Sequence, residues 1–540
     1  MNFATPTGFR DVMPQEALRR EKLAHACQGL FAAHGYQPIE TPTLESFEVM
    51  EHGGHVPGAP FKLFDRAGDL LAMRPDVTLQ VARMCATRLK TQPGPFRFRY
   101  TQRIFRETEP QMPAREMTQI GVECIGEAGA QTDAELLALL VEALRGCGLE
   151  DFMISIGTVS VLHALLDACS DDEEWKAEVR NAFHTSNFVE LDTLLEGPNA
   201  PVGKEDYLDA IRRLPRIRGG REAIDEVNAL VAPLGCAAGL RAFAETYRAV
   251  DDAGLADCVL VDFSVMSSFD YYTGLIFEVY SPNVGTPLGG GGRYDKVLAS
   301  YGQERPAAGF AFYLEQVMKA LDLTGSDKDR PLRIAVPKGS LNEGTIACLK
   351  RAGLDTAGLA NPGRKLIISN PGVDYIIVRP TDAPVFTALG AADCGICGKD
   401  SLVEANLDVV ELVDLQFGDC RFVVAEPNGS TPKVEERYRS LGFIRVATKY
   451  PRITRAYYDS IGVQVEIVRL HGNIELAPIT GLAERIVDIT ATGTTLRENN
   501  LSVVDDVMAS TARFFANTCA FRTDERVTAL AEALKNGSEN

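Results

Sequence analysis

The chain has 540 residues and is too long for one hydrophobic core, because single cores stop growing at roughly 250 to 300 residues. Apolar residues make up 45% and charged residues 24%, as in folded proteins rather than disordered or fibrous ones. The net charge of −19 argues against general binding to nucleic acid or to an anionic membrane, since both need a basic surface.

The start of the chain and its cysteines indicate a reducing cytoplasm. The first residues lack the basic and then apolar pattern of a secretory signal, and the twelve cysteines are scattered. The most apolar helical segment, residues 136–149, contains Glu142 and Arg145 and is shorter than the roughly 20 apolar residues that cross a bilayer. We therefore expect a cytoplasmic protein without membrane insertion.

The first part of the chain is predicted to form an antiparallel sheet with helices. From Gln15 to His34 apolar residues recur at helical spacing, and Gly35 follows as a helix stop. Residues 96–100 and 276–280 alternate apolar and polar side chains, as half-buried strands do. Residues 162–247 have a mostly helical pattern without a chemical motif, so we interpret them as an inserted helical subdomain.

The second part is predicted to be α/β. Residues 323–331 are polar and aperiodic, as in a linker. A strand at 333–336, a helix at 341–349 and a strand at 375–378 then alternate. The predicted domains are therefore residues 1–322 and 332–540.

Cys394 and Cys397 have a spacing that occurs in zinc and redox sites. No second pair completes a four-thiolate site, and their surroundings resemble a buried strand end that runs into a glycine turn. We expect two apolar cysteines here and no metal site.

Residues 485–496 are the most informative segment, because an apolar strand that ends in a carboxylate, Asp488, is followed by a Thr/Gly loop that opens a helix. Gly493 allows the backbone to approach a ligand, and successive N–H groups with threonine hydroxyls form a cradle for phosphate. Asp488 is then placed to hold ribose hydroxyls. Taken alone, such a loop is more often an ordinary turn with threonine caps. The predicted binding residues are Asp488, Thr490, Ala491, Thr492, Gly493, Thr494 and Thr495.

This segment and five others resemble ATP phosphoribosyltransferase, and the resemblance runs from Arg333 nearly to the end of the chain. The resemblance implies two α/β lobes, like a periplasmic binding protein, with the active site between them. It also implies attack of adenine N1 of ATP on C1 of phosphoribosyl pyrophosphate, with release of pyrophosphate. Too few residues follow position 496 for the regulatory domain of the long form, so the short form is expected. The matching segments are residues 333–339, 378–382, 390–400, 446–451, 472–478 and 488–496.

The implied reaction needs no general base, because adenine N1 already carries a lone pair. Catalysis should come from orientation and preorganised charge around two polyanions, with Mg²⁺ on the pyrophosphate. A lone lysine or arginine is usually a solvated surface charge, but positions beside Gly339, Gly363 and Pro451 favour a functional role. The resemblance implies catalytic roles for Lys338, Arg364, Lys449 and Asp488, a phosphoribosyl pyrophosphate site at Asp488 and 490–495, and ATP-binding roles for Lys338, Gly339, Arg379, Asp382, Asp393, Gly395, Lys399 and Arg452.

Two positions depart from that family. Ser340 stands where arginine commonly follows Pro-Lys-Gly, which removes a possible phosphate contact. Ala491 stands where many members carry glutamate, which leaves the backbone cradle and Asp488 in place.

Residues 7–321 resemble the catalytic core of histidyl-tRNA synthetase, which implies a class II synthetase fold. Two cations of a working synthetase are missing. Ser267 lies where an arginine activates the carboxylate, and Gln316 lies where an arginine clamps ATP. No anticodon-binding domain follows. This pattern matches the regulatory subunit that short-form ATP phosphoribosyltransferases require. The matching segments are residues 8–14, 74–78, 105–106, 119–126, 270–278 and 291–295.

Side chains of the histidine side remain, and we predict that they bind histidine as a feedback inhibitor. The alternative is a buried polar network that only supports the fold. The predicted residues are Asp76, Thr78, Arg106, Gln119, Glu123, Tyr271 and Tyr272.

A fusion of both parts makes their docking intramolecular. The expected partners are ATP, phosphoribosyl pyrophosphate, L-histidine and further copies of the chain, associated through both halves. Two alternatives remain open: a working histidyl-tRNA synthetase with an appended nucleotide-binding domain, and a non-catalytic ligand sensor.

Overall fold

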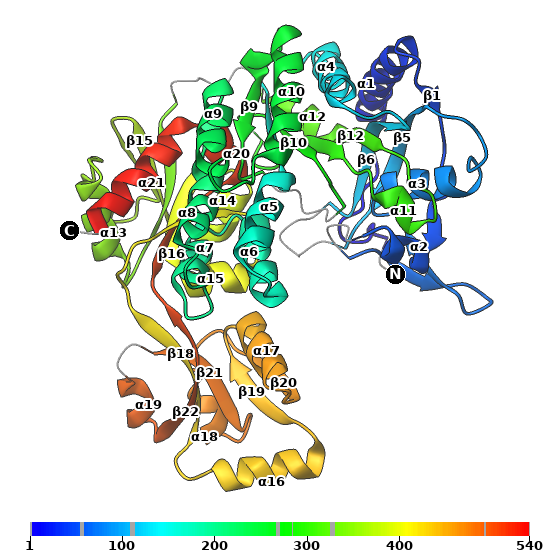
Figure 1. Ribbon diagram of the computed structural model, residues 1–540. Coiled ribbons are helices and arrows are strands. Elements are labelled where there is room, and N and C mark those ends of the chain that lie inside the picture. The colour runs from blue at the N-terminus through cyan, green and yellow to red at the C-terminus, as the bar shows by residue number, and fades with distance from the viewer. Residues whose placement is uncertain are drawn as a thin grey trace. The chain divides into compact units, whose positions relative to one another are not determined.

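The chain divides into two compact units, Met1–Lys328 and Asp329–Asn540. The computed structural model describes residues 3–54, 59–107, 114–265, 271–282, 284–323, 330–490 and 493–538 (Figure 1). Within these ranges no helix combines the length and apolar character of a membrane span. The predicted linker, residues 323–331, lies largely outside the described ranges, since residues 324–329 are not part of them.

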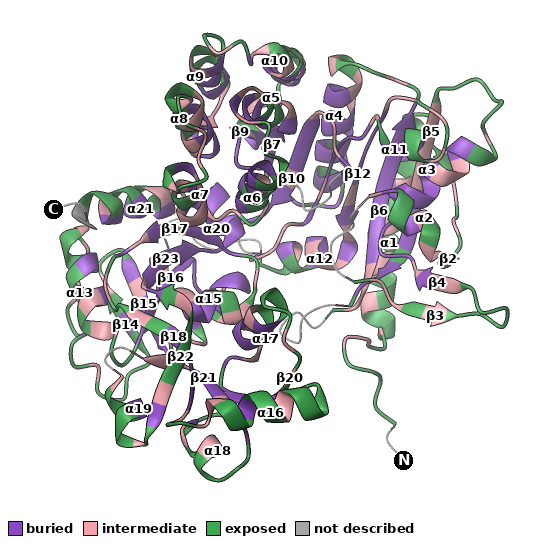
Figure 2. Cartoon of the chain, turned by 60° about the horizontal axis from the view of Figure 1, so that its bottom comes forward, coloured by how far each residue is buried: buried purple, intermediate pink, exposed green. Residues whose placement is uncertain are grey.

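The first unit is built on a nine-stranded sheet in the order β1-β5-β6-β12-β11-β10-β7-β9-β8. All neighbours are antiparallel except β1 with β5 and β7 with β9. β6, β10 and β12 are almost wholly buried (Figure 2). The strands are β1 (Gln37–Pro38), β5 (Phe96–Phe105), β6 (Glu116–Ile125), β7 (Met153–Thr158), β8 (Arg218–Gly219), β9 (Val259–Asp262), β10 (Leu275–Tyr280), β11 (Gly289–Arg293) and β12 (Ala307–Tyr313), and a smaller sheet holds β2 (Leu44–Ser46), β4 (Leu70–Met73) and β3 (Lys62–Phe64).

Helices cover this sheet, and the antiparallel sheet with helices predicted for this part is confirmed. The predicted N-terminal helix is α1, which starts with Pro14, buries Cys27 and Phe31 and ends before Gly35, where φ is +82°. Helices α5 to α10 occupy the segment interpreted as a helical subdomain. The helices are α1 (Pro14–Ala33), α2 (Phe47–His52), α3 (Thr78–Thr87), α4 (Ala130–Gly146), α5 (Val159–Cys169), α6 (Glu173–His184), α7 (Phe188–Glu196), α8 (Glu205–Arg213), α9 (Arg221–Val231), α10 (Ala238–Asp252), α11 (Val297–Ser300) and α12 (Leu314–Asp322).

The second unit contains two sheets, and the first of them defines lobe 1. Its order is β14-β15-β13-β16-β23-β17, with β13 parallel to both β15 and β16. The strands are β13 (Leu332–Pro337), β14 (Ile367–Asn370), β15 (Val373–Val378), β16 (Cys394–Gly398), β17 (Val410–Asp414) and β23 (Ala512–Ala516), and the helices are α13 (Asn342–Arg351), α14 (Ala383–Ala388), α15 (Lys399–Ala405), α20 (Thr518–Thr523) and α21 (Glu525–Ser538).

The other sheet defines lobe 2, with the order β20-β19-β21-β18-β22 and β19 parallel to β20 and β21. The chain crosses between the lobes twice, from β17 to β18 and from β22 to β23. Two α/β lobes were expected, and the structure confirms them. The strands are β18 (Cys420–Pro427), β19 (Ile444–Thr448), β20 (Val465–Arg469), β21 (Arg485–Thr490) and β22 (Leu501–Ser510), and the helices are α16 (Thr431–Leu441), α17 (Pro451–Ser460), α18 (Leu476–Ile479) and α19 (Thr494–Glu498).

Cys394 and Cys397 lie inside β16 and are fully buried, which confirms the predicted apolar strand. Burial raises the pKa of both thiols well above the ordinary range. All twelve cysteines of the chain fall within the described residues and are free thiols.

Candidate functional site

The parallel strands of lobe 1 end at one edge of its sheet, and two predicted residues follow neighbouring strand ends there. Pro337 at the end of β13 pairs with Val378 at the end of β15, so Lys338 and Arg379 come next to each other in the register. The Lys338 N–H donates to the Val378 carbonyl over 3.0 Å. Both side chains are exposed. Ligands of α/β proteins commonly bind at such carboxyl ends.

Four other predicted residues reach the same edge. Gly339 follows Lys338 with a φ of +93°. Arg364 precedes β14, which runs antiparallel to β15, and so lies beside the carboxyl end of β15. Asp382 is the residue before α14, and Lys399 is the first residue of α15, directly after β16. The structure therefore brings six sequence-predicted residues to one edge.

Lobe 2 has an equivalent edge, formed by β19 and β21. Thr448 pairs with Val487 in the parallel register, which makes Lys449 and Asp488 neighbours. Lys449 is exposed, and Arg452 lies three residues further on, in the first turn of α17. Lys449 and Asp488, which were predicted from motifs far apart in the sequence, are thus neighbours where β19 and β21 pair.

The Asp488 carboxyl is half-buried, and burial raises its pKa to about 6. The N–H of Ile489, which donates to Asp488 Oδ1 over 2.8 Å, and the charge of Lys449 act in the opposite direction, while the charge of Glu475 raises this pKa further. Asp488 is therefore ionised above pH 6 and takes up a proton below it.

The described parts of the Thr/Gly segment are the predicted strand, β21, and the predicted helix, α19. Gly493 has a φ of +69°, and its N–H donates to Thr490 Oγ1 over 2.9 Å. Helix α19 begins at Thr494, and both Thr494 and Thr495 are exposed. The remaining two predicted members of the loop, Ala491 and Thr492, lie outside the described residues.

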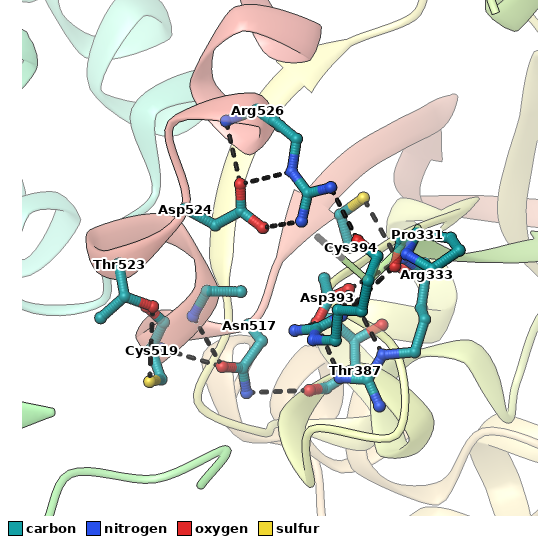
Figure 3. A network of polar contacts seen from close by, with 12 residues as sticks. Pro331, Arg333, Thr387, Asp393, Cys394, Asn517, Cys519, Thr523, Asp524 and Arg526 are labelled. Carbon is teal, nitrogen blue, oxygen red and sulfur yellow. Dashed lines mark hydrogen bonds and ion pairs between the residues drawn. The ribbon is translucent and has the colours of Figure 1, made fainter. Parts of the chain in front are cut away.

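Two predicted ATP-binding residues do not reach either edge. Asp393 lies before β16, at the amino end of the parallel strands, and its carboxylate accepts bonds from Arg330 and Arg333 at 2.7 to 2.8 Å (Figure 3). Burial alone would raise its pKa, but the hydrogen bonds from both arginines outweigh burial and hold this pKa below the ordinary range. Asp393 therefore links the amino-terminal ends of β13 and β16.

Gly395 lies inside β16, opposite Ala335, and not at a strand end. A side chain there would come within 2.9 Å of the Phe515 ring and the Thr387 hydroxyl. Packing and ion pairing within lobe 1 account for the positions of Gly395 and Asp393, and their ATP-binding role stays a prediction.

The first unit gathers most of its predicted residues around the buried carboxyl of Glu123 on β6. Glu123 Oε1 accepts hydrogen bonds from the hydroxyls of Thr78 (2.7 Å) and Tyr100 (3.3 Å), and the Tyr294 hydroxyl donates to Oε2. The rings of Tyr271 and Tyr294 are 5.8 Å apart, and those of Tyr271 and Tyr272 are 4.9 Å apart. We call these residues, together with Asp76, the Glu123 cluster.

Glycines on neighbouring strands leave the space that the Glu123 cluster occupies. A Cβ at Gly309, opposite Glu123 in the register, would collide with the Glu123 carboxylate. A Cβ at Gly121 would lie 2.6 Å from the Tyr100 hydroxyl. The glycines of these strands are thus a condition for placing large polar side chains between them.

Burial raises the pKa of Glu123 to about 8, although the hydroxyls of Tyr294, Thr78 and Tyr100 stabilise its ionised form. The nearby charge of Asp76 raises it further. Burial also raises the pKa of Asp76, against the charge of Arg106 and the N–H groups of Leu79 and Thr78. At neutral pH the Glu123 carboxyl therefore keeps its proton, until a cation beside it favours release.

The two remaining predicted residues border this cluster. Gln119 is buried on the same strand as Glu123, and its Oε1 atom has no hydrogen-bond partner among the described residues. Arg106 is buried, and its Nε donates to the Pro75 carbonyl over 2.8 Å.

Gln316, in place of an arginine, lies half-buried on α12, where the adjacent Glu315 pairs with Arg20. Ser267, at the other missing arginine, is not among the described residues.

Sequence reasoning did not select Tyr100 or Tyr294 as site residues. Tyr100 was visible only as a member of an alternating strand, and Tyr294 only as part of a glycine-rich motif. The register of β5 with β6 pairs Tyr100 with Gly121 and so places Tyr100 beside Glu123. For Tyr294, the available sequence signal was its position two residues after a run of glycines.

These observations define a class II synthetase-like unit followed by a two-lobed α/β unit. A family profile described as histidyl-tRNA synthetase matches residues 8–317, more than half of the chain, and a profile described as ATP phosphoribosyltransferase matches residues 379–536. The chain belongs to the ATP phosphoribosyltransferase family through its second unit and to the histidyl-tRNA-synthetase-like regulatory-subunit family through its first. Both resemblances are thereby confirmed, and the enzymatic activity of the chain is that of an ATP phosphoribosyltransferase.

Individual relatives match one unit each. The ATP phosphoribosyltransferase regulatory subunit of Moorella thermoacetica is 38% identical over 323 residues, which cover 58% of this chain and 81% of the relative. The ATP phosphoribosyltransferase of the same organism is 49% identical over 215 residues, which cover 38% of this chain and 93% of the relative. A solved structure of an ATP phosphoribosyltransferase regulatory subunit/histidyl-tRNA synthetase from Bacillus halodurans matches with a TM-score of 0.56 and 28% identity, covering 70% of this chain and 93% of that one.

Replacing Asp488 by asparagine tests the edge of lobe 2. If the ionised carboxylate holds the ribose hydroxyls, Asp488→Asn lowers turnover by about tenfold, equivalent to about 1.4 kcal/mol. In the unsubstituted chain the KM for phosphoribosyl pyrophosphate should rise as pH falls through about 6, because the carboxylate is then protonated, and the variant should lack this rise. Steady-state kinetics between pH 5 and 8 measure both effects.

The matched control is Asp506→Asn, at an exposed aspartate of β22 that pairs with Arg421. A folded Asp488→Asn enzyme with the kinetics and pH profile of this control would remove Asp488 from the site.

Proposed function

We propose that the two strand edges of the second unit bind the two substrates of the phosphoribosyl transfer. The adjacency of Lys449 and Asp488, directly before the Thr/Gly loop, is the observation that carries this proposal. Asp488 holds the ribose hydroxyls, and Thr490 with Gly493–Thr495 holds the phosphate through hydroxyl and N–H groups. Lys338, Arg364 and Lys449 stabilise the departing pyrophosphate, and the ATP-binding residues are Gly339, Arg379, Asp382, Lys399 and Arg452.

The chemical step needs little from the protein besides placement and charge. The lone pair of adenine N1 forms a bond to C1 of the ribose while the bond from C1 to the pyrophosphate oxygen breaks, and the electrons leave with the pyrophosphate. Cations that already point at that oxygen lower the barrier without reorganisation. The exposed cations at both strand edges supply this charge.

We propose that Mg²⁺ enters bound to phosphoribosyl pyrophosphate. Among the described residues no group of three or more histidine, cysteine, aspartate or glutamate side chains is arranged to hold a metal ion. Mg²⁺ commonly keeps several waters and binds through substrate phosphates with one or two carboxylates. Asp488 and Glu475, close enough to influence each other electrostatically, are the carboxylates at this edge.

We propose that the first unit senses histidine and does not activate it. The Glu123 cluster offers a carboxyl for an ammonium group, aromatic rings for an imidazole and a buried amide oxygen at Gln119 without a partner among the described residues. A binding group that is already buried but unsatisfied gains a hydrogen bond when a ligand enters. The interpretation of these residues as a purely structural network predicts no such ligand.

We also propose that the chain acts in a reducing cytoplasm as a homo-oligomer joined through both units. Twelve free thiols, eleven of them buried, suit a reducing compartment. Exposed apolar side chains on each unit, such as Phe64 and Leu366, are available for contacts between copies.

The first unit should not catalyse histidine-dependent exchange of pyrophosphate into ATP. Adenylate formation needs cations on the carboxylate and the triphosphate, and the positions of two such arginines hold Ser267 and Gln316. Radiolabelled pyrophosphate, ATP and histidine, mixed with the full chain without phosphoribosyl pyrophosphate, provide the test. Robust exchange would establish a working synthetase instead.

Replacing Glu123 tests the sensing role. Glu123→Ala should raise the histidine concentration for half inhibition at least about tenfold and leave the uninhibited rate nearly intact. In the unsubstituted chain inhibition should strengthen as pH rises from neutrality toward the pKa of about 8, because the ionised carboxylate pairs better with an ammonium group. Glu123→Gln, which cannot ionise, should not show this trend.

Glu142→Ala is the control, since Glu142 is exposed on α4 and bonds to His34 outside the Glu123 cluster. Equal loss of activity and inhibition in Glu123→Ala would assign Glu123 a structural role.

A further inference from the structure

Helix α17 of lobe 2 begins two residues after Lys449. Its own sequence supplies no side-chain cap for its first turn. Tyr450 occupies the capping position and offers no such bond, and Pro451 follows as the first helical residue. The first N–H groups of a helix have no partner within it and need an acceptor from elsewhere. The cap must therefore come from another part of the structure.

That acceptor is Glu404, which lies on α15 of lobe 1. Its carboxylate accepts the Arg452 N–H over 3.1 and 3.2 Å through both oxygens, and the Ile453 N–H over 3.1 Å. These are the second and third helical positions, whose N–H groups a local capping side chain usually satisfies. Helices α15 and α17 lie side by side in both views (Figures 1 and 2).

The charges around Glu404 favour this arrangement. Burial raises the pKa of Glu404, while the N–H groups of Ile453 and Arg452 and the charges of Arg452 and Arg469 stabilise its ionised form. A carboxylate at a helix N-terminus is also favoured by the helix dipole. Glu404 thus lies on a helix of lobe 1, whereas the N–H groups and arginines that stabilise its charge belong to lobe 2.

The same two helices begin at the two substrate edges. Helix α15 starts at Lys399, directly after β16, and its Asp400 accepts a bond from the Ser510 hydroxyl at 2.9 Å, where β22 ends. Helix α17 starts two residues after Lys449 and carries Arg452. A change in the spacing of the two helices would therefore move the cations of one edge relative to those of the other.

On the basis of the substrate roles proposed above for Lys449 and Arg452, we propose that Glu404 is a positioning residue for the phosphoribosyl transfer, because its carboxylate caps α17 across the lobes and sets these two cations against the lobe 1 edge. It contacts no reacting atom and acts through the first turn of α17. Its effect should appear in the transition state, because misplaced cations stabilise the departing pyrophosphate less.

The test compares Glu404→Ala with Glu404→Gln in the full chain, by steady-state kinetics with both substrates and by thermal unfolding. Glu404→Ala should lower kcat and kcat/KM together by about tenfold. Glu404→Gln keeps an oxygen acceptor at the helix start and should remain within about threefold of the unsubstituted enzyme. Glu435→Ala, at an exposed glutamate of α16, serves as the control and should change neither value.

Two results would overturn the proposal. A folded Glu404→Ala enzyme with unchanged kcat and kcat/KM, even at a lower unfolding temperature, would show that the cap only stabilises α17. A Glu404→Gln enzyme as impaired as Glu404→Ala would show that the charge itself is needed, as for a contact with substrate or Mg²⁺. If Glu404→Ala does not fold, Glu404→Asp replaces it. Its carboxylate is one methylene further from α17, so the proposal requires a larger loss for Glu404→Asp than for Glu404→Gln.

Discussion

The parallel register of β19 with β21 is the constraint on which the transferase unit depends. It places Lys449 beside Asp488, although 38 positions of chain containing a strand and two helices separate them. The parallel pairing of β13 with β15 does the same for Lys338 and Arg379 in lobe 1. Because parallel strands end at a common edge, each lobe collects groups from separate motifs without a dedicated binding domain. The proposed site for two polyanions requires that the lobes keep a defined spacing, and the carboxylates of Glu404 and Asp400 on lobe 1 accept hydrogen bonds from lobe 2.

In the synthetase-like unit, the main constraint is the burial of a carboxyl inside a sheet. An isolated buried charge is costly, and Glu123 avoids most of this cost by keeping its proton and by accepting hydrogen bonds from three hydroxyls. Gly121 and Gly309 supply the necessary space. A group in this state can ionise when a cationic ligand arrives, so ligand entry and proton release are linked. The proposed histidine-sensing role requires a group in this state, while the positions of two arginines needed for adenylate chemistry hold Ser267 and Gln316.

Local patterns predicted much of this fold, and long-range pairing explains what they missed. The spacing of apolar residues predicted α1, and the order of strand, carboxylate and Thr/Gly loop predicted β21 and α19, because these features depend on neighbouring residues. Tyr100 and Glu404 became apparent only through their partners, Gly121 and the N–H groups of α17, which lie elsewhere in the chain. A motif also does not say at which end of a strand each of its residues lies, as Asp393 shows. It precedes β16, whereas Lys399 follows it.

We propose that one chain carries both the transfer reaction and its control by histidine. The most direct measurement is pyrophosphate release by the purified full chain, with ATP and phosphoribosyl pyrophosphate supplied singly and together, and with increasing histidine. We expect release only when both substrates are present, and we expect histidine to lower the rate without any added regulatory protein. Release that requires a separate regulatory subunit, or that histidine leaves unchanged, would contradict it.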